Sequence, residues 1–176
     1  IKEYLKKMCH TDNQLTIPIS GTGSAGMEAC FVNLIEPDDN VLVLINGVFG
    51  MRMEDVATRL GANVDSLHFE WGTAVNIGTV HQQLSKTSYD LVAVVHAETS
   101  TGVCNPIEDI GQLVKEHGAL FLVDCVTSLG GMDVRMDDWY IDAIYSGTQK
   151  CLSCPPGLSP ISFSDQAITK LSNRKS

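Results

Sequence analysis

Two ionisable side chains follow apolar runs that are typical of buried strands. Asp124 comes directly after the run 119–123, and Lys150 ends the segment SGTQK that follows the run 141–145. A carboxylate and an amine at such positions are groups that enzymes use for acid–base and nucleophilic catalysis. The alternatives are a turn-forming aspartate and a solvated surface lysine. No amphipathic helical pattern surrounds Lys150, which favours a functional interpretation.

A glycine-rich segment, SGTGSAGMEAC at residues 20–30, is the third chemical signal. Gly21, Gly23 and Gly26 have the G-x-G-x-x-G spacing of a dinucleotide-binding turn. A dinucleotide site also needs an acidic residue about 20 positions later to bind the ribose. That position falls near Asn46, which is an amide, so a nicotinamide-dependent oxidoreductase is the weaker alternative.

The same segment is suited to a phosphate of another kind. A helix that begins here presents unpaired backbone N–H groups and the positive end of its dipole, and both attract a phosphate. The hydroxyls of Thr22 and Ser24 add further donors. Pyridoxal phosphate needs a Schiff-base lysine, an acid for its ring nitrogen and N–H groups for its phosphate. Lys150, Asp124 and the glycine-rich segment supply these three parts.

The elements that must position these residues alternate along the chain. This rhythm predicts an α/β fold, a three-layer α-β-α sandwich with a mostly parallel sheet and an antiparallel edge strand. Pro18 and Pro160 each favour an edge position for their strands. The expected strands are 15–20, 40–46, 63–69, 89–97, 119–126, 141–147 and 157–164, and the expected helices are 1–9, 26–35, 50–61, 78–86, 106–118 and 167–176.

Polar residues follow most of these strands. In open parallel sheets, ligands bind at the carboxyl ends of the strands. The segments that reach this edge carry glycine turns, hydroxyls, an aspartate, a glutamine and a lysine, which together are typical of a cofactor pocket. They are 20–26, 46–50, 98–102, Asp124 and 146–150.

Composition limits the other possibilities. The chain has 176 residues, 44% of them hydrophobic, with a net charge of −9. These values suit one large globular domain, or part of a larger one, and argue against general nucleic-acid binding, which requires a basic face. No apolar run approaches the roughly 18 residues of a membrane span. The six cysteines do not form a disulfide framework, and Cys151-x-x-Cys154 lacks the second pair that a zinc site requires, so we expect no metal.

Several motifs occur in order along most of the chain. They are NGVFG (46–50), ETSTGV (98–103), VDCVTSLGG (123–131), SGTQK (146–150), PPG (155–157) and SFSD (162–165). Together they resemble the class V aminotransferases of pyridoxal-phosphate fold type I, most closely the alanine–glyoxylate and serine–pyruvate group. The resemblance implies that the glycines face the phosphate of pyridoxal 5′-phosphate.

The resemblance implies catalytic roles for two residues. Lys150 would be the internal-aldimine lysine and the proton carrier of the 1,3-shift. Asp124 would pair with the pyridine nitrogen of the cofactor. Val126 would lie on one face of the ring and Phe49 on the other, where many relatives have Trp. Thr99 would bind near the phenolic oxygen.

The resemblance also assigns the phosphate contacts. Thr22, Gly23 and Ser24 would hold the phosphate from the helix start, and Gln149 would add a side-chain donor. Some relatives have His at the position of Ser24, which changes the polarity beside the phosphate but keeps a backbone donor.

The implied reaction is transfer of an amino group from alanine or serine to glyoxylate or pyruvate. The alternatives are another class V reaction, of the desulfurase or kynureninase type. Residues 1–176 would be the central part of the cofactor-binding large domain, without an N-terminal arm and a C-terminal small domain that supplies the arginine for the substrate carboxylate. We therefore expect the intact protein to be an intracellular homodimer located in the peroxisome, the mitochondrion or the cytoplasm. We expect the 176-residue fragment to be inactive on its own.

Overall fold

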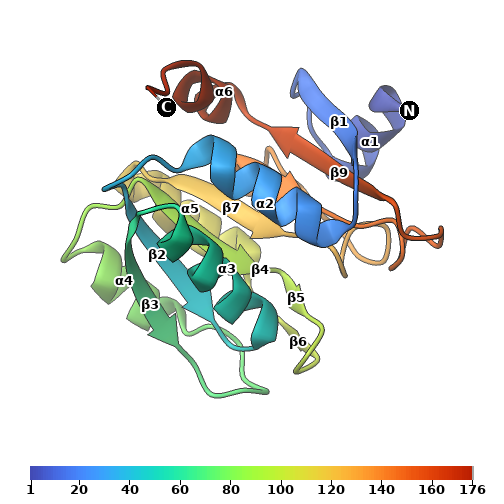
Figure 1. Ribbon diagram of the computed structural model, residues 1–176. Coiled ribbons are helices and arrows are strands. Elements are labelled where there is room, and N and C mark those ends of the chain that lie inside the picture. Colours follow the sequence, from blue (N-terminus) through green and yellow to red (C-terminus); the bar gives the residue numbers. More distant parts are fainter. Residues whose placement is uncertain (176) are drawn as a thin grey trace.

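A seven-stranded sheet forms the centre of the structure, a computed structural model that describes residues 1–175 (Figure 1). Five strands run parallel to one another, and the sixth in the order below, β9, is antiparallel to both of its neighbours. From one edge to the other the order is β3 (Asn63–His68), β2 (Asn40–Ile45), β4 (Leu91–Val95), β7 (Leu120–Asp124), β8 (Ala143–Tyr145), β9 (Leu158–Phe163) and β1 (Leu15–Ser20).

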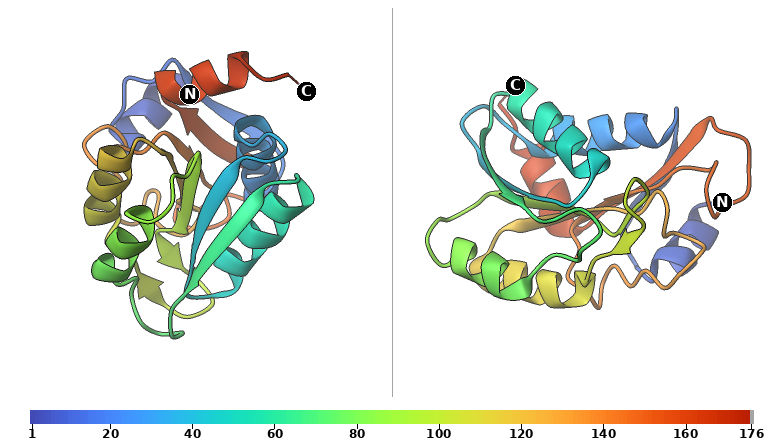
Figure 2. Two further views of the ribbon diagram at one scale, coloured as in Figure 1. Left: turned by 90° about the vertical axis from the view of Figure 1, so that its left-hand side faces the viewer. Right: turned by 90° about the horizontal axis from the view of Figure 1, so that it is seen from below.

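Helices cover both faces of this sheet. One face packs against α2 (Gly23–Leu34), α3 (Val48–Arg59) and α6 (Asp165–Ser172). The other face packs against α1 (Lys2–Cys9), α4 (Ile77–Leu84) and α5 (Ile107–His117). Figure 2 shows the sheet between the α2–α3 pair and the α4–α5 pair. The predicted three-layer sandwich is confirmed.

The central strands are buried on both sides because their sequences are apolar throughout. In β2, Leu42 and Leu44 belong to the core under α4 and α5, while Val41, Val43 and Ile45 belong to the core under α2 and α3. Side chains of a strand alternate between the two faces, so a continuous apolar run fills both cores at once. A short hairpin that the sequence did not predict, β5 (Ala97–Glu98) and β6 (Val103–Cys104), follows β4.

The prediction from Pro160 was wrong, whereas the one from Pro18 is confirmed. Pro18 lies in β1, an edge strand, but Pro160 lies in β9, between β1 and β8. The carbonyl of Pro160 still accepts the N–H of Ser146, and the Ser159 hydroxyl donates to the Ser146 carbonyl at 2.5 Å. Because a side chain supplies a donor beside the missing proline N–H, β9 tolerates proline inside the sheet.

Three helices begin two or three residues earlier than predicted. The sequence predicts helices from residues 26 and 50, whereas α2 starts at Gly23 and α3 at Val48. Consequently Gly23 and Gly26 are both helical, and of the three glycines in this segment Gly21 has a positive φ, of 142°. The helix predicted at 167–176 starts earlier too, at Asp165 behind the capping residue Ser164, and ends at Ser172; residue 176 lies outside the described residues.

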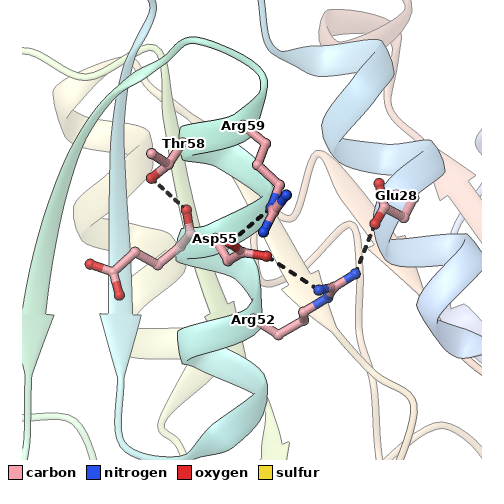
Figure 3. Close-up of polar contacts among 6 residues, drawn as sticks. Glu28, Arg52, Asp55, Thr58 and Arg59 are labelled. Atoms are coloured by element: carbon pink, nitrogen blue, oxygen red, sulfur yellow. Dashed lines mark hydrogen bonds and ion pairs between the residues drawn. The ribbon is translucent and has the colours of Figure 1, made fainter.

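Surface ion pairs join α2 to α3. Arg52 of α3 binds Glu28 of α2 at 3.1 Å and Asp55 of its own helix at 3.2 Å, and Asp55 also binds Arg59 (Figure 3). Both helices start at the carboxyl edge of the sheet, so these contacts link the two elements that begin beside the site.

In the described part of the chain, no helix is long and apolar enough to cross a membrane.

Candidate functional site

One pocket lies at the carboxyl ends of β4, β7 and β8, beside the first turns of α2 and α3. The structure brings most of the predicted site residues to it, together with four that the sequence did not indicate. The predicted residues in its lining are Gly23, Ser24, Phe49, Thr99, Asp124, Val126 and Lys150, and the additional ones are Met27, Val95, Thr127 and Tyr145.

Asp124, the last residue of β7, is buried, and each of its carboxylate oxygens accepts one hydrogen bond. Its Oδ1 accepts the N–H of Val126 at 2.8 Å, and its Oδ2 accepts the hydroxyl of Tyr145 at 2.7 Å. Burial raises the pKa of Asp124 to about 6, opposed by these two hydrogen bonds; the charge of Glu98 raises the pKa further and that of Lys150 lowers it. The two chemical groups that the sequence singled out therefore line one pocket and interact electrostatically.

Tyr145, the last residue of β8, is the partner that sequence reasoning missed. It is directly paired with Asp124 in the parallel register of β7 and β8, and it is fully buried. Burial and the negative charge of Asp124 raise the pKa of Tyr145 well above its usual value. The phenol therefore remains protonated at neutral pH and acts as a permanent donor to the carboxylate.

Lys150 lies in the connection between β8 and β9 and is partly buried. Backbone bonds from Ser146 to Pro160 and from Thr148 to Leu158 hold the first part of this connection against β9. The Thr148 hydroxyl also donates to the Pro155 carbonyl at 2.8 Å. These contacts fix the segment that ends at Lys150, the one cationic side chain among the described lining residues.

The first turn of α2 supplies free donors. The N–H groups of Ala25 and Gly26 bind the Thr22 carbonyl, whereas among the described residues no acceptor binds those of Gly23 and Ser24. A Cβ on Gly23 would lie 2.8 Å from a methyl group of Val126, so glycine is needed for this close approach. The helix start thus presents two N–H groups and its dipole toward the pocket.

Hydroxyl and aromatic groups complete the lining. The side-chain oxygens of Thr99 and Thr127 are 2.5 Å apart and share a hydrogen bond. Phe49 is 37% exposed, so part of the residue remains free to contact a ligand. The sequence did not indicate Thr127 as a site residue. Its position directly after the predicted site residue Val126 is the feature from which it could have been predicted.

Two predicted residues are outside the lining. Thr22 is the exposed N-cap of α2, directly before Gly23, and its side chain makes no capping bond. Gln149 is exposed, and its carboxamide lies against Gly147, where a Cβ would be 2.7 Å from the amide oxygen. Both residues adjoin lining residues in the chain, and their phosphate contacts stay predictions.

The two cysteines of the C-x-x-C segment lie at the surface. Cys151 and Cys154 are exposed free thiols, and the Cys151 thiol donates to the Thr127 carbonyl at 3.1 Å. Within residues 1–175, no three side chains of His, Cys, Asp or Glu are grouped so as to hold a metal ion.

Comparison with known proteins gives a consistent family. The family model described as aminotransferase class-V matches residues 1–176. The chain is 42% identical over 173 residues to the (S)-ureidoglycine–glyoxylate transaminase of Bacillus subtilis, which covers 98% of this chain and 42% of that protein. It is 41% identical over 175 residues to the alanine–glyoxylate aminotransferase of Rattus norvegicus, covering 99% of this chain and 42% of the relative.

A solved structure has the same fold over nearly the whole chain. The alanine–glyoxylate aminotransferase from Nostoc sp. superimposes with a TM-score of 0.97 at 44% identity, covering 99% of this chain and 46% of that one. The present chain thus spans less than half the length of the relatives that it matches.

Proposed function

Because this chain belongs to the class V aminotransferases, we propose that the protein transfers an amino group from alanine or serine to glyoxylate or pyruvate, with pyridoxal 5′-phosphate as cofactor. The observation that carries the proposal is the meeting of Asp124 and Lys150 in one pocket beside the free N–H groups of α2. The names of the relatives support glyoxylate as the acceptor, since all three contain it.

The pocket residues fit this cofactor. The unpaired N–H groups of Gly23 and Ser24 suit a phosphate, and Gly23 leaves room where a Cβ would collide with Val126. The carboxylate of Asp124 is an acceptor for a ring nitrogen. Val126 and Phe49 supply apolar surfaces for a flat ring.

We assign the chemistry to side chains as follows. When bound, pyridoxal phosphate supplies a ring that accepts negative charge from the substrate Cα. The Lys150 Nζ would be the group that accepts the substrate proton and returns it during the transfer. The Asp124 carboxylate would hold the protonated ring nitrogen, while Tyr145 and Val126 fix the orientation of that carboxylate.

The first experiment tests the lysine. The full-length protein, mixed with pyridoxal phosphate, is expected to develop the visible absorption of a lysine-bound cofactor. Lys150→Ala should lose that absorption, and Lys86→Ala, at an exposed lysine just beyond α4, should keep it. Retention of the band by Lys150→Ala would assign the covalent attachment to another amine and overturn this role of Lys150.

The second experiment separates reaction types. Glycine formed from glyoxylate is measured with alanine, serine or (S)-ureidoglycine as donor, because one relative is named for the last compound. Sulfide release from cysteine is measured in parallel. Sulfide without glycine would favour the desulfurase alternative, and tight binding of labelled NAD would favour an oxidoreductase.

We also propose a homodimer. Val48 and Met51, in the first turn of α3 beside the site, are apolar but 47% and 48% exposed, which is consistent with a partner surface there. Sedimentation equilibrium of the full-length protein should give twice the mass of one chain. A monomeric mass at micromolar concentration would contradict this assembly.

A further inference from the structure

We propose that Glu98 is a positioning residue of the cofactor pocket: its buried carboxylate holds the first turn of α3 and thereby keeps the Phe49 ring on the pocket. The inference rests on the proposed function, because the ring is taken to contact the cofactor. It concerns a residue that does not itself line the pocket.

Glu98 is buried without a cation. The residue is 1% exposed, and no ion pair in the described part of the chain includes its carboxylate. A buried carboxylate is costly unless it is hydrogen-bonded. Glu98 meets this requirement with backbone and hydroxyl donors, and their identity shows what the residue holds.

Two of the donors come from the start of α3. Oε2 of Glu98 accepts the N–H of Phe49 at 3.2 Å and that of Gly50 at 3.3 Å. Oε1 accepts the N–H of Ser100 at 3.1 Å and its hydroxyl at 2.7 Å. The Ser100 hydroxyl oxygen in turn accepts the N–H of Val48 at 2.9 Å.

The pair Glu98 and Ser100 therefore caps three consecutive N–H groups of α3. The residue in the capping position of the helix, Gly47, has no side chain to do so. A Cβ at Gly47 would collide with the side chain of Glu98 and lie 2.6 Å from the Ser100 hydroxyl. Gly47 is therefore required because no room exists for a side chain. Its backbone conformation does not require glycine, because a φ of 177° is ordinary extended backbone. A negative charge at this position also complements the helix dipole.

This cap connects two walls of the pocket. Phe49, held through its N–H, lines the pocket on the α3 side, and Thr99, the next residue after Glu98, lines it on the β5 side. The Glu98 carbonyl accepts the N–H of Gly102 at 2.8 Å, which closes the turn that carries Thr99. Loss of the carboxylate charge would loosen the link between these two walls.

The test is a double-mutant cycle on the full-length protein, read as the dissociation constant of pyridoxal phosphate. We expect Glu98→Gln to raise this constant at least fivefold, and Phe49→Ala to raise it by a similar factor. If Glu98 acts through Phe49, adding Glu98→Gln to Phe49→Ala should change the constant by less than twofold. Glu108→Gln, at an exposed acidic residue in the first turn of α5, is the matched control and should match the wild type.

Two results would overturn the proposal. One is a Glu98→Gln variant that binds the cofactor within twofold of the wild type. The other is that Glu98→Gln raises the dissociation constant by the same factor in the wild-type protein and in Phe49→Ala. That result would mean that Glu98 acts independently of the Phe49 ring. Ser100→Ala, a milder change to the same cap, serves if Glu98→Gln does not fold.

A measurement without cofactor separates this inference from the proposed function. Amide hydrogen exchange of residues 48–50 should accelerate at least tenfold in Glu98→Gln relative to Glu108→Gln. Unchanged exchange would refute the cap itself. Failure of the wild-type protein to bind pyridoxal phosphate, with the exchange result as expected, would refute the proposed function and the pocket role but leave the cap established.

Discussion

The hydroxyl of Tyr145 donates to Oδ2 of Asp124 at 2.7 Å, across the register pair that joins β8 to β7. The two residues are thereby held by backbone pairing as well as by the side-chain bond. The second oxygen of Asp124 is bound by the N–H of Val126. The orientation of the carboxylate in the pocket is therefore set by the sheet, before any ligand binds.

Tyr145→Phe should raise the pKa of Asp124 above its value of about 6, because the bond from Tyr145 lowers that pKa. A hydrogen bond to a charged group contributes about 1.5–3 kcal/mol, so we expect cofactor affinity to fall by roughly tenfold or more. The pKa is measured by carbon NMR of the Asp124 carboxyl. Tyr140→Phe, at a tyrosine that is 43% exposed, is the control and should change neither quantity.

The stability of the cofactor-free protein should depend on pH through Asp124. Its folded-state pKa of about 6 lies above the usual 3.8, so the folded state binds this proton more tightly than the unfolded state. The contribution of the group is therefore complete below about pH 4 and is lost as the pH rises to about 6. The loss amounts to about 3 kcal/mol.

Urea unfolding of wild type and Asp124→Asn at a series of pH values checks this sign. Other titrating groups, including His96 with its pKa lowered to about 4 by burial, are common to both proteins. The stability of wild type relative to Asp124→Asn should decrease between pH 4 and 6. A constant difference would show that Asp124 titrates at its ordinary pKa.

Gly26→Ala should destabilise the fold by about 1–3 kcal/mol, as overpacking of a filled core does. A Cβ at Gly26 would collide with the Ser159 hydroxyl, which donates to the Ser146 carbonyl, and would lie 3.0 Å from Cβ of Tyr145. Thermal unfolding measures the effect. Gly78→Ala, at an exposed helical glycine in α4 where a Cβ would lie 3.2 Å from Oδ1 of Asn76, should change stability by less than about 1 kcal/mol; equal losses at both sites would contradict the packing argument.

Arg52→Ala should lower the free energy of unfolding by less than about 1 kcal/mol, although Arg52 bridges α2 and α3 (Figure 3). The side chains of Arg52 and Glu28 are both 49% exposed, so water and salt screen their attraction. The small difference should shrink further in 1 M NaCl. A loss above 2 kcal/mol that persists in high salt would show that the bridge is important for packing the two helices.

The main features of the site were predictable because they depend on local sequence. Asp124 follows one apolar strand, and Lys150 ends a short segment that follows another apolar strand. Because the carboxyl ends of parallel strands meet at one edge of the sheet, both residues are expected at that edge. The apolar runs of β2, β4 and β7 likewise predict their place in the sheet. These inferences need only the order of the elements.

Other features depend on contacts that one segment cannot reveal. Tyr145 reads as an ordinary core residue until the register with β7 places it opposite Asp124. The early starts of α2 and α3 were missed because glycine in the sequence was taken to mark a turn. Gly23 and Gly47 are instead glycines because their backbones lie close to Val126 and Glu98. Pro160 is tolerated inside the sheet because the neighbouring Ser159 supplies a donor.

The pairing of β1 with β9 has a consequence for biosynthesis. Leu15 is opposite Phe163, so the partner of β1 leaves the ribosome about 150 residues after it, on the order of ten seconds later at ~5–20 residues per second. During this interval the nascent chain carries an unpaired strand, LTIPIS, next to an incomplete core. This edge of the sheet is therefore completed only after residues 158–163 have been synthesised.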